Sequence, residues 1–148
     1  MAEKLCTLRT KGGGGGGSCK IKPILLWQNP SPSASFSPSE VNIISGVEYD
    51  PTVYGGIILE YKKYYSDTTI QSQWINDIDL TQQFFVCSTR DALSASMYNQ
   101  YIRQIMATST TKLKFGNAFK GGTNYGTAYN NYMIPIKVYM FEMPEVEY

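Results

Sequence analysis

Hydrophobic and polar residues alternate with a period of two along several short segments, the pattern of half-buried β-strands. The clearest example is "YMIPIKVYMF" (132–141). Its apolar face is expected to point at the core and comprises Ile134, Ile136, Val138 and Met140. Lys137 and Tyr139 are expected to face away, and Pro135, which lacks a backbone donor, favours the edge of a sheet.

Further β-rich runs are separated by turn-forming residues. They are "KPILLWQ" (22–28), "VNIISGV" (41–47), "IILEYKKYY" (57–65), "TTIQSQWI" (68–75), "QFFVCST" (83–89) and "KLKFG" (112–116). About eight short strands with little helix predict an all-β fold, an antiparallel β-sandwich of jelly-roll-like type. The connecting segments are predicted to be a rigid Pro/Ser loop anchored by Phe36, a turn at 49–56 and a surface loop at 117–131.

The pattern of one segment, 91–107, fits either a helix or a pair of short strands. Leu93, Met97, Tyr101 and Ile105 recur every four residues, as on one face of a helix. The same residues also fit two short strands. We expect a loop at 91–96 and a strand from Tyr98 onwards.

The glycine run in "KGGGGGGSCK" (11–20) divides the chain into two parts. A phosphate-binding loop would place a lysine directly after the last glycine, whereas here Ser18 follows Gly17. The run instead predicts a tether, so that 1–20 forms a flexible leader and 21–148 a single domain. Within that domain Cys87 is predicted to be buried and inert, whereas Cys6 and Cys19 are predicted to react with thiol reagents.

Charge and composition restrict the partners. The net charge of +1 gives no case for binding nucleic acid, and no apolar run is long enough to be inserted into a membrane. The ends differ in charge, because residues 1–22 carry +4 and the C-terminal end is acidic. The three cysteines provide no disulfide framework.

The sequence shows no catalytic constellation. With 0 histidines, the Ser-His-Asp and Cys-His mechanisms are excluded, and three cysteines cannot form a four-thiolate zinc site. "NDID" (76–79) lacks the later ligands of a calcium loop and is expected to be a solvated turn. Glu60 and Asp79 are candidates for a carboxylate pair only by default. We therefore expect no enzyme, no metal and no cofactor.

Aromatic and amide side chains are the remaining candidates for a binding surface. Tyrosine and tryptophan give a large rigid contact area, and asparagine and glycine adapt their hydrogen bonds. The candidate ligand-binding residues are Tyr64, Tyr65, Trp74, Tyr125, Tyr129 and Tyr132. The alternative is that half of these rings simply close the ends of a sandwich.

Several segments resemble the terminal domains of tail-associated virion proteins from phages and prophages of gut Firmicutes: 25–43, a "YD" turn before "IILEYKKY", then "LKFGNAF", a Gly/Asn loop and "YMIPIKVYMF". The resemblance covers most of 24–141, with a Leu-Trp-x-Asn-Pro-x-Pro opening and a closing Ile-Pro-x-Lys-x-Tyr strand. The matching positions are Leu26, Trp27, Asn29, Pro30, Pro32, Phe36, Ile134, Pro135, Lys137 and Tyr139.

The resemblance implies that the two ends pair as adjacent strands, with Trp27 under the Pro/Ser loop. It implies a virion protein made in the host bacterial cytoplasm, attached to other virion proteins by its leader and binding a glycan or protein on the host surface. A homo-oligomer such as a trimer is compatible with it. The alternatives are a decoration or assembly module without a ligand and, less favoured, a polysaccharide-cleaving enzyme.

Overall fold

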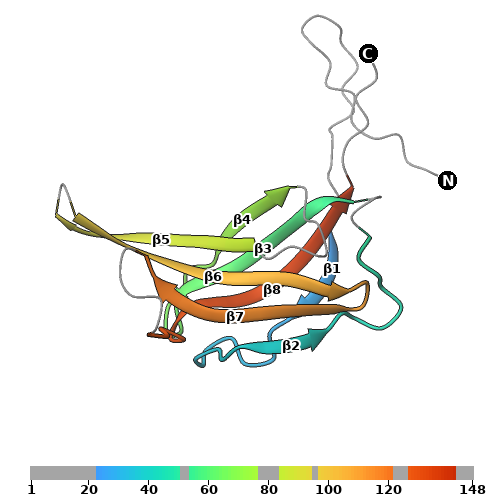
Figure 1. Cartoon of the computed structure of the whole chain (residues 1–148), viewed down its shortest axis with the longest axis horizontal. Helices are drawn as coiled ribbons and strands as arrows, with labels where there is room; N and C mark the ends of the chain where they lie inside the picture. Colours follow the sequence, from blue (N-terminus) through green and yellow to red (C-terminus); the bar gives the residue numbers. More distant parts are fainter. Residues whose placement is uncertain (1–22, 51–53, 77–83, 95–96, 122–126, 143–148) are drawn as a thin grey trace, which may run out of the picture.

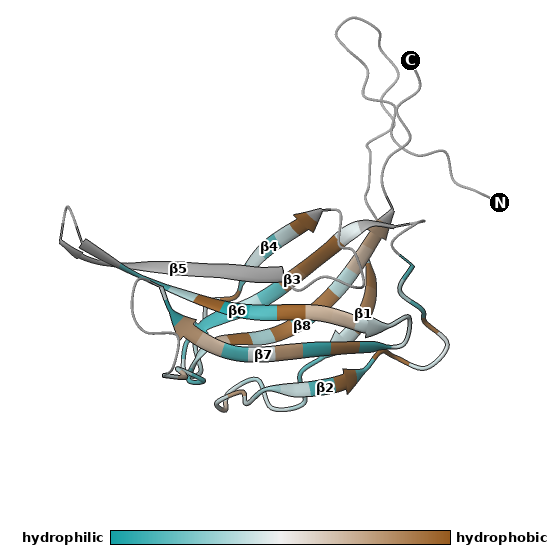
Figure 2. Cartoon of the chain, in the orientation of Figure 1, coloured by the Kyte–Doolittle hydropathy of each residue, from teal (hydrophilic) through white to brown (hydrophobic). Residues whose placement is uncertain are grey.

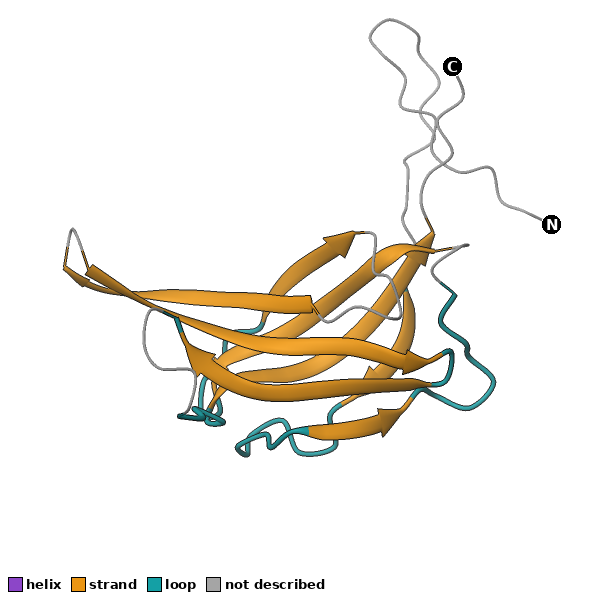
Figure 3. Ribbon diagram, viewed as in Figure 1, coloured by secondary structure: helices purple, strands orange, loops and turns teal. Residues whose placement is uncertain are grey.

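In the computed structural model the described residues, 23–50, 54–76, 84–94, 97–121 and 127–142, form an all-β fold. No helix occurs in these ranges, and eight strands connected by loops account for them (Figure 3). Several expectations, among them the leader at 1–20 and the loop residue Tyr125, lie outside the described residues.

The strands form two antiparallel sheets of four strands each (Figure 1). The order in the first sheet is β1 (Ile24–Gln28), β8 (Tyr132–Glu142), β3 (Tyr54–Tyr64) and β4 (Gln71–Asn76). The order in the second sheet is β2 (Ser39–Asn42), β7 (Lys112–Lys120), β6 (Met97–Ser109) and β5 (Phe84–Ser94). This arrangement is consistent with the predicted β-sandwich, and the expected pairing of the first strand with the last is confirmed, because Ile24 lies opposite Met140.

A single core cluster takes side chains from both sheets, so the sheets cover each other's apolar faces. Figure 2 shows the alternation of apolar and polar residues along β7 and β8 that this packing requires. At its centre the ring of Trp27 lies 5.9 Å from that of Phe36 and 5.1 Å from that of Phe115. The prediction that Phe36 anchors the Pro/Ser loop over Trp27 is confirmed.

The residues of β8 predicted to face the core do so only on the C-terminal side of a bulge. All four predicted apolar residues are buried, and Val138 and Met140 belong to the core cluster. Ile134 and Ile136 are buried outside that cluster, and Met133 takes the core position at the start of the strand. The reason is that β8 has an extra residue at 136, between the pairs Tyr61–Pro135 and Glu60–Lys137, which reverses the alternation.

The Pro/Ser loop crosses the sheet near the start of β8. The backbone N–H of Asn29 donates to the carbonyl of Ile136, on the β1 side of β8. On the other side, Lys62 of β3 donates through Nζ to the carbonyl of Pro32 at 3.1 Å. Since β8 lies between β1 and β3, the chain from 29 to 32 crosses β8 at this point.

The ambiguous segment is a strand pair, and the loop predicted at 91–96 is wrong for 91–94. Asp91 pairs with Asn99 and Ala92 with Tyr98, so β5 continues to Ser94. The fourfold spacing of apolar residues did not produce a helix because β6 is held on both sides, by β5 and β7.

Three further boundaries differ from the sequence prediction. The strand expected at 41–47 ends at Asn42, because residues 44–47 turn around Gly46, whose φ of 83° suits glycine. The turn expected at 49–56 gives way to β3 at Tyr54. The loop expected at 117–131 begins only after Lys120, because β7 keeps its pairing with β6 as far as that residue.

Candidate functional site

Five tyrosines form a continuous aromatic cluster at the end of the domain where β3 ends and β8 begins. They are Tyr64, Tyr65, Tyr101, Tyr129 and Tyr132, called the tyrosine cluster below. Four of them were predicted as site residues, and Tyr101 of β6 was not. No local pattern marks Tyr101 as a site residue, because it belongs to the apolar spacing of 93–105.

Tyr132 is the centre of the cluster. Its ring stacks on Tyr101 with centroids 3.8 Å apart and an interplanar angle of 8°. Tyr64 contacts the same ring at 4.9 Å, and Tyr65 contacts Tyr64 at 4.6 Å. Tyr101 is buried, whereas the other four rings are half-buried, so the cluster has a packed base and an accessible side.

Backbone contacts hold the rings in place. Tyr129 donates its backbone N–H to the carbonyl of Ala118, and Tyr65 donates its own to the carbonyl of Asn131. The side chain of Asn130 accepts a hydrogen bond from the backbone N–H of Ala118 and donates to Asn117. The loop ahead of β8 is therefore fixed to the end of β7, which positions Tyr129 and Tyr132.

Two phenols of the cluster, those of Tyr101 and Tyr64, have a raised pKa. Burial raises the pKa of Tyr101 far above its usual value, and a hydrogen bond with Tyr132 raises it further. Partial desolvation and the neighbouring Tyr65 raise the pKa of Tyr64. At neutral pH the hydroxyl groups of Tyr64 and Tyr101 are thus uncharged and can donate and accept hydrogen bonds.

Trp74 lies apart from the tyrosine cluster. It is on the edge strand β4, 51% exposed, with its ring 5.1 Å from that of Phe141. The structure therefore does not bring it together with the tyrosines into one site. Tyr125 falls outside the described residues.

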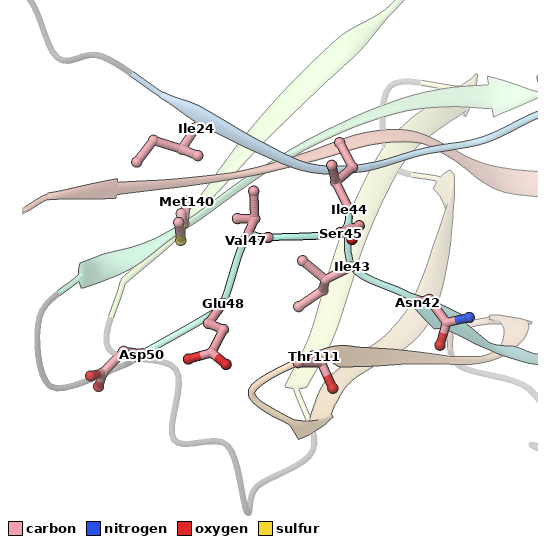
Figure 4. Close-up of a pocket in the computed structure, with 11 residues that line it drawn as sticks. Ile24, Asn42, Ile43, Ile44, Ser45, Val47, Glu48, Asp50, Thr111 and Met140 are labelled. Carbon is pink, nitrogen blue, oxygen red and sulfur yellow. The ribbon is translucent and has the colours of Figure 1, made fainter.

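A hollow of about 840 Å³ opens at the other end of β8 (Figure 4). It is bounded by Ile24 of β1, Met140 of β8 and the segment 42–50 that follows β2. This hollow could not be predicted from the sequence, because the segment 41–47 has the pattern of a strand and its turn around Gly46 forms part of the wall. No tyrosine is among the residues that line it.

In the described part of the chain, no three His, Cys, Asp or Glu residues come together in a way that could hold a metal ion. The described residues include no helix with the length and apolarity needed to cross a membrane. Glu60 lies on β3 opposite Lys137, and Asp79 is outside the described residues, so no carboxylate pair is formed by these two within them.

Comparison of the chain with protein-family models, with curated proteins and with solved structures found no match.

Proposed function

We propose that this chain is a tail-associated virion protein of a bacteriophage, whose β-sandwich domain binds a glycan or protein on the host surface without catalysis. The half-buried tyrosine cluster is the observation that carries the proposal. Flat aromatic rings with neutral hydroxyls suit the apolar faces and hydroxyl groups of sugars. The resemblance of 25–43 and 132–141 to phage tail domains supports the assignment to a virion.

The order of strands supports a jelly-roll-like sandwich within this proposal. β1 pairs with β8 and β2 pairs with β7, so the first two strands pair with the last two in nested order. The connections from β3 to β4 and from β5 through β7 are hairpins. The ends of such a domain present loops and strand termini, which are common positions for binding residues.

The test is a glycan array with purified protein, followed by affinity measurements on Tyr65→Ala and Tyr129→Ala. Each variant should bind at least about tenfold more weakly, because about 1.4 kcal/mol of lost stacking corresponds to a factor of ten. Tyr139→Ala is the matched control, since Tyr139 is a half-buried tyrosine of β8 away from the cluster. Urea unfolding would show that all three variants remain folded.

A second candidate function, a decoration or assembly module, is favoured by a row of side chains across the first sheet. The cross-strand register places Trp74 opposite Ile58, Ile58 opposite Tyr139 and Tyr139 opposite Leu25. This apolar row crosses all four strands. If it is a subunit interface, the protein should be a stable oligomer in light scattering and Trp74→Ser should dissociate it. Glycan binding lost in Tyr65→Ala with no oligomer present would favour the first function.

A further inference from the structure

The strand β4 forms the outer edge of the first sheet, next to β3 (Figure 1). Within the described residues, no strand lies on its other side. An edge strand carries a row of backbone N–H and C=O groups that can pair with a strand from another chain. Proteins commonly prevent such pairing with charged residues, prolines, bulges or very short edge strands.

The other three sheet edges in the described part of the chain carry such a device. β1 has a bulge between Leu25 and Trp27. β2 has four residues and includes Glu40. β5 has two shifts in its register with β6 and includes Arg90 and Asp91. These edges are therefore poorly suited to pairing with a further strand.

The edge strand β4 carries none of these devices. Its six residues, QSQWIN, include no charge and no proline, and its register with β3 has no shift. Its one bulky ring leaves the edge clear, because Trp74 lies 5.1 Å from Phe141 of β8 and so leans over β3. Among the described residues, β4 thus presents a neutral and unobstructed backbone edge.

A second copy of the same strand fits this edge. Antiparallel pairing about a twofold axis brings β4 against itself, which would set like charges close together if the strand were charged. The neutral β4 has no such repulsion. Residues that lie opposite each other must point to the same face, so the axis has to pass through a residue. An axis at Gln73 places Trp74 opposite Ser72 of the other copy, so that the large ring faces a small side chain.

We propose that two copies of this chain join their β4 edges about a twofold axis at Gln73, so that two four-stranded sheets become one continuous sheet. The proposal rests on the second candidate function, assembly, and gives that function a partner and a geometry. It makes no use of the tyrosine cluster.

Sedimentation equilibrium of the full-length protein, at concentrations from about 1 µM to about 1 mM, tests the proposal. The expected result is a monomer–dimer equilibrium. Ser72→Lys should raise the dissociation constant at least about tenfold at low salt, because the two lysines would be diagonal neighbours about 7–8 Å apart. Ser35→Lys, at an exposed serine of the Pro/Ser loop, is the matched control and should leave the dissociation constant unchanged.

A charge swap shows whether the two strands face each other. Ser72→Glu alone should also weaken the dimer, whereas an equal mixture of Ser72→Glu and Ser72→Lys should restore association, because opposite charges then meet. A mixture that stays as weakly associated as either variant alone would overturn the proposal.

Tyr139→Ala distinguishes pairing at the edge from packing of the apolar row on the face of the sheet. Tyr139 is on β8, two strands from the edge, so its truncation should leave an edge-paired dimer intact. An oligomer that Tyr139→Ala dissociates and Ser72→Lys does not would overturn the edge pairing but keep the assembly function. A protein that is monomeric at every concentration would overturn both.

Discussion

Arg103 joins three segments of the chain through one side chain. Its Nε donates to the carbonyl of Met133 at 2.8 Å, and its two terminal nitrogens donate to the carbonyls of Gly116 at 2.7 Å and Tyr132 at 3.0 Å. The guanidinium also lies over the ring of Phe36, 5.2 Å from the centroid. Burial lowers the pKa of Arg103 to about 10, which still leaves it charged at neutral pH. The charge is therefore held inside by carbonyl dipoles and an aromatic face.

Arg103→Met should lower the free energy of unfolding by about 2–4 kcal/mol. The substitution keeps an unbranched stem but leaves buried carbonyls without donors, and each unsatisfied buried group costs about 1–3 kcal/mol. The measurement is urea unfolding, with Lys137→Ala as the control, for which we expect a change within about 0.5 kcal/mol. A loss for Arg103→Met as small as the control would mean that these carbonyls have other donors.

Tyr101 should make the domain sensitive to alkali. Its pKa in the folded state is raised above the ordinary value of 10.0, so its contribution to stability is complete below pH 10 and is lost as the pH rises beyond. Unfolding by urea from pH 8 to 11 should show a steeper fall for the wild type than for Tyr101→Phe. The effect of Arg103 on stability has the opposite sign. Because its pKa is lowered to about 10 in the folded state, the folded state gains stability as the pH rises above that value. That effect is present in both proteins and cancels in the comparison.

At the scale of elements, Asn29 fixes the crossing of the Pro/Ser loop over β8. Its side-chain amide donates to the carbonyl of Pro135 at 2.8 Å, and its side-chain oxygen accepts the backbone N–H of Ser31 at 2.8 Å. The residue is 4% exposed, so neither group can turn to water instead. Pro135 can be accommodated in the middle of a sheet because the chain is bulged at the next residue.

Asn29→Ala should cost about 1–3 kcal/mol, because it leaves the buried carbonyl of Pro135 unpaired. Asn42→Ala, at an exposed asparagine of β2, is the control and should change stability by less than about 0.5 kcal/mol. Both values come from chemical denaturation. If the two variants were equally stable, the side chain of Asn29 would have no part in holding the loop.

The bulge in β8 predicts an order among core substitutions. Trp27→Ala should cost about 3–5 kcal/mol, because Trp27 packs between Phe36 and Phe115 in the core. Ile136→Ala should cost about 2 kcal/mol, at the low end for such a truncation, because Ile136 lies outside the core cluster. A greater loss at Ile136 than at Trp27, measured by urea unfolding, would contradict the placement of the bulge.

The sequence predicted the elements better than their faces and ends. Period-two alternation identified β8, and the Trp27 and Phe36 motif identified the loop that covers the core, because both depend on neighbours within a few residues. The extra residue at 136 and the ring of Tyr101 under Tyr132 depend on strands far away in the sequence. Of the candidate site, the sequence predicted Tyr64, Tyr65, Tyr129 and Tyr132 but wrongly grouped Trp74 with them, since local composition carries no information about which end of a sheet a residue occupies.

At the scale of the whole molecule, the central pairings join distant parts of the chain. Ile24 pairs with Met140, and Val41 pairs with Leu113. Forming such contacts requires long loops to close before the contacts give any stability.

Refolding should accordingly be slow for a domain of this size, in the range of about milliseconds to seconds. Stopped-flow dilution from urea, followed by tryptophan fluorescence, measures it. Trp27 reports directly, because its environment changes when the core forms, and Trp27→Phe checks that the signal comes from this residue. Complete refolding within microseconds would indicate that local hairpins, and not the long-range pairs, limit the rate.

The central position of β8 has a consequence for the protein as it is synthesised. β8 lies between β1 and β3, so the first sheet lacks one of its two inner strands until residue 142 has left the ribosome. Until then the nascent chain carries β1 and β3 with no partner on the sides that β8 will occupy. At about 5–20 residues per second, synthesis of the roughly hundred residues between β1 and β8 takes several seconds. During that interval the apolar faces of the early strands are available to chaperones and to neighbouring nascent chains on the same messenger RNA.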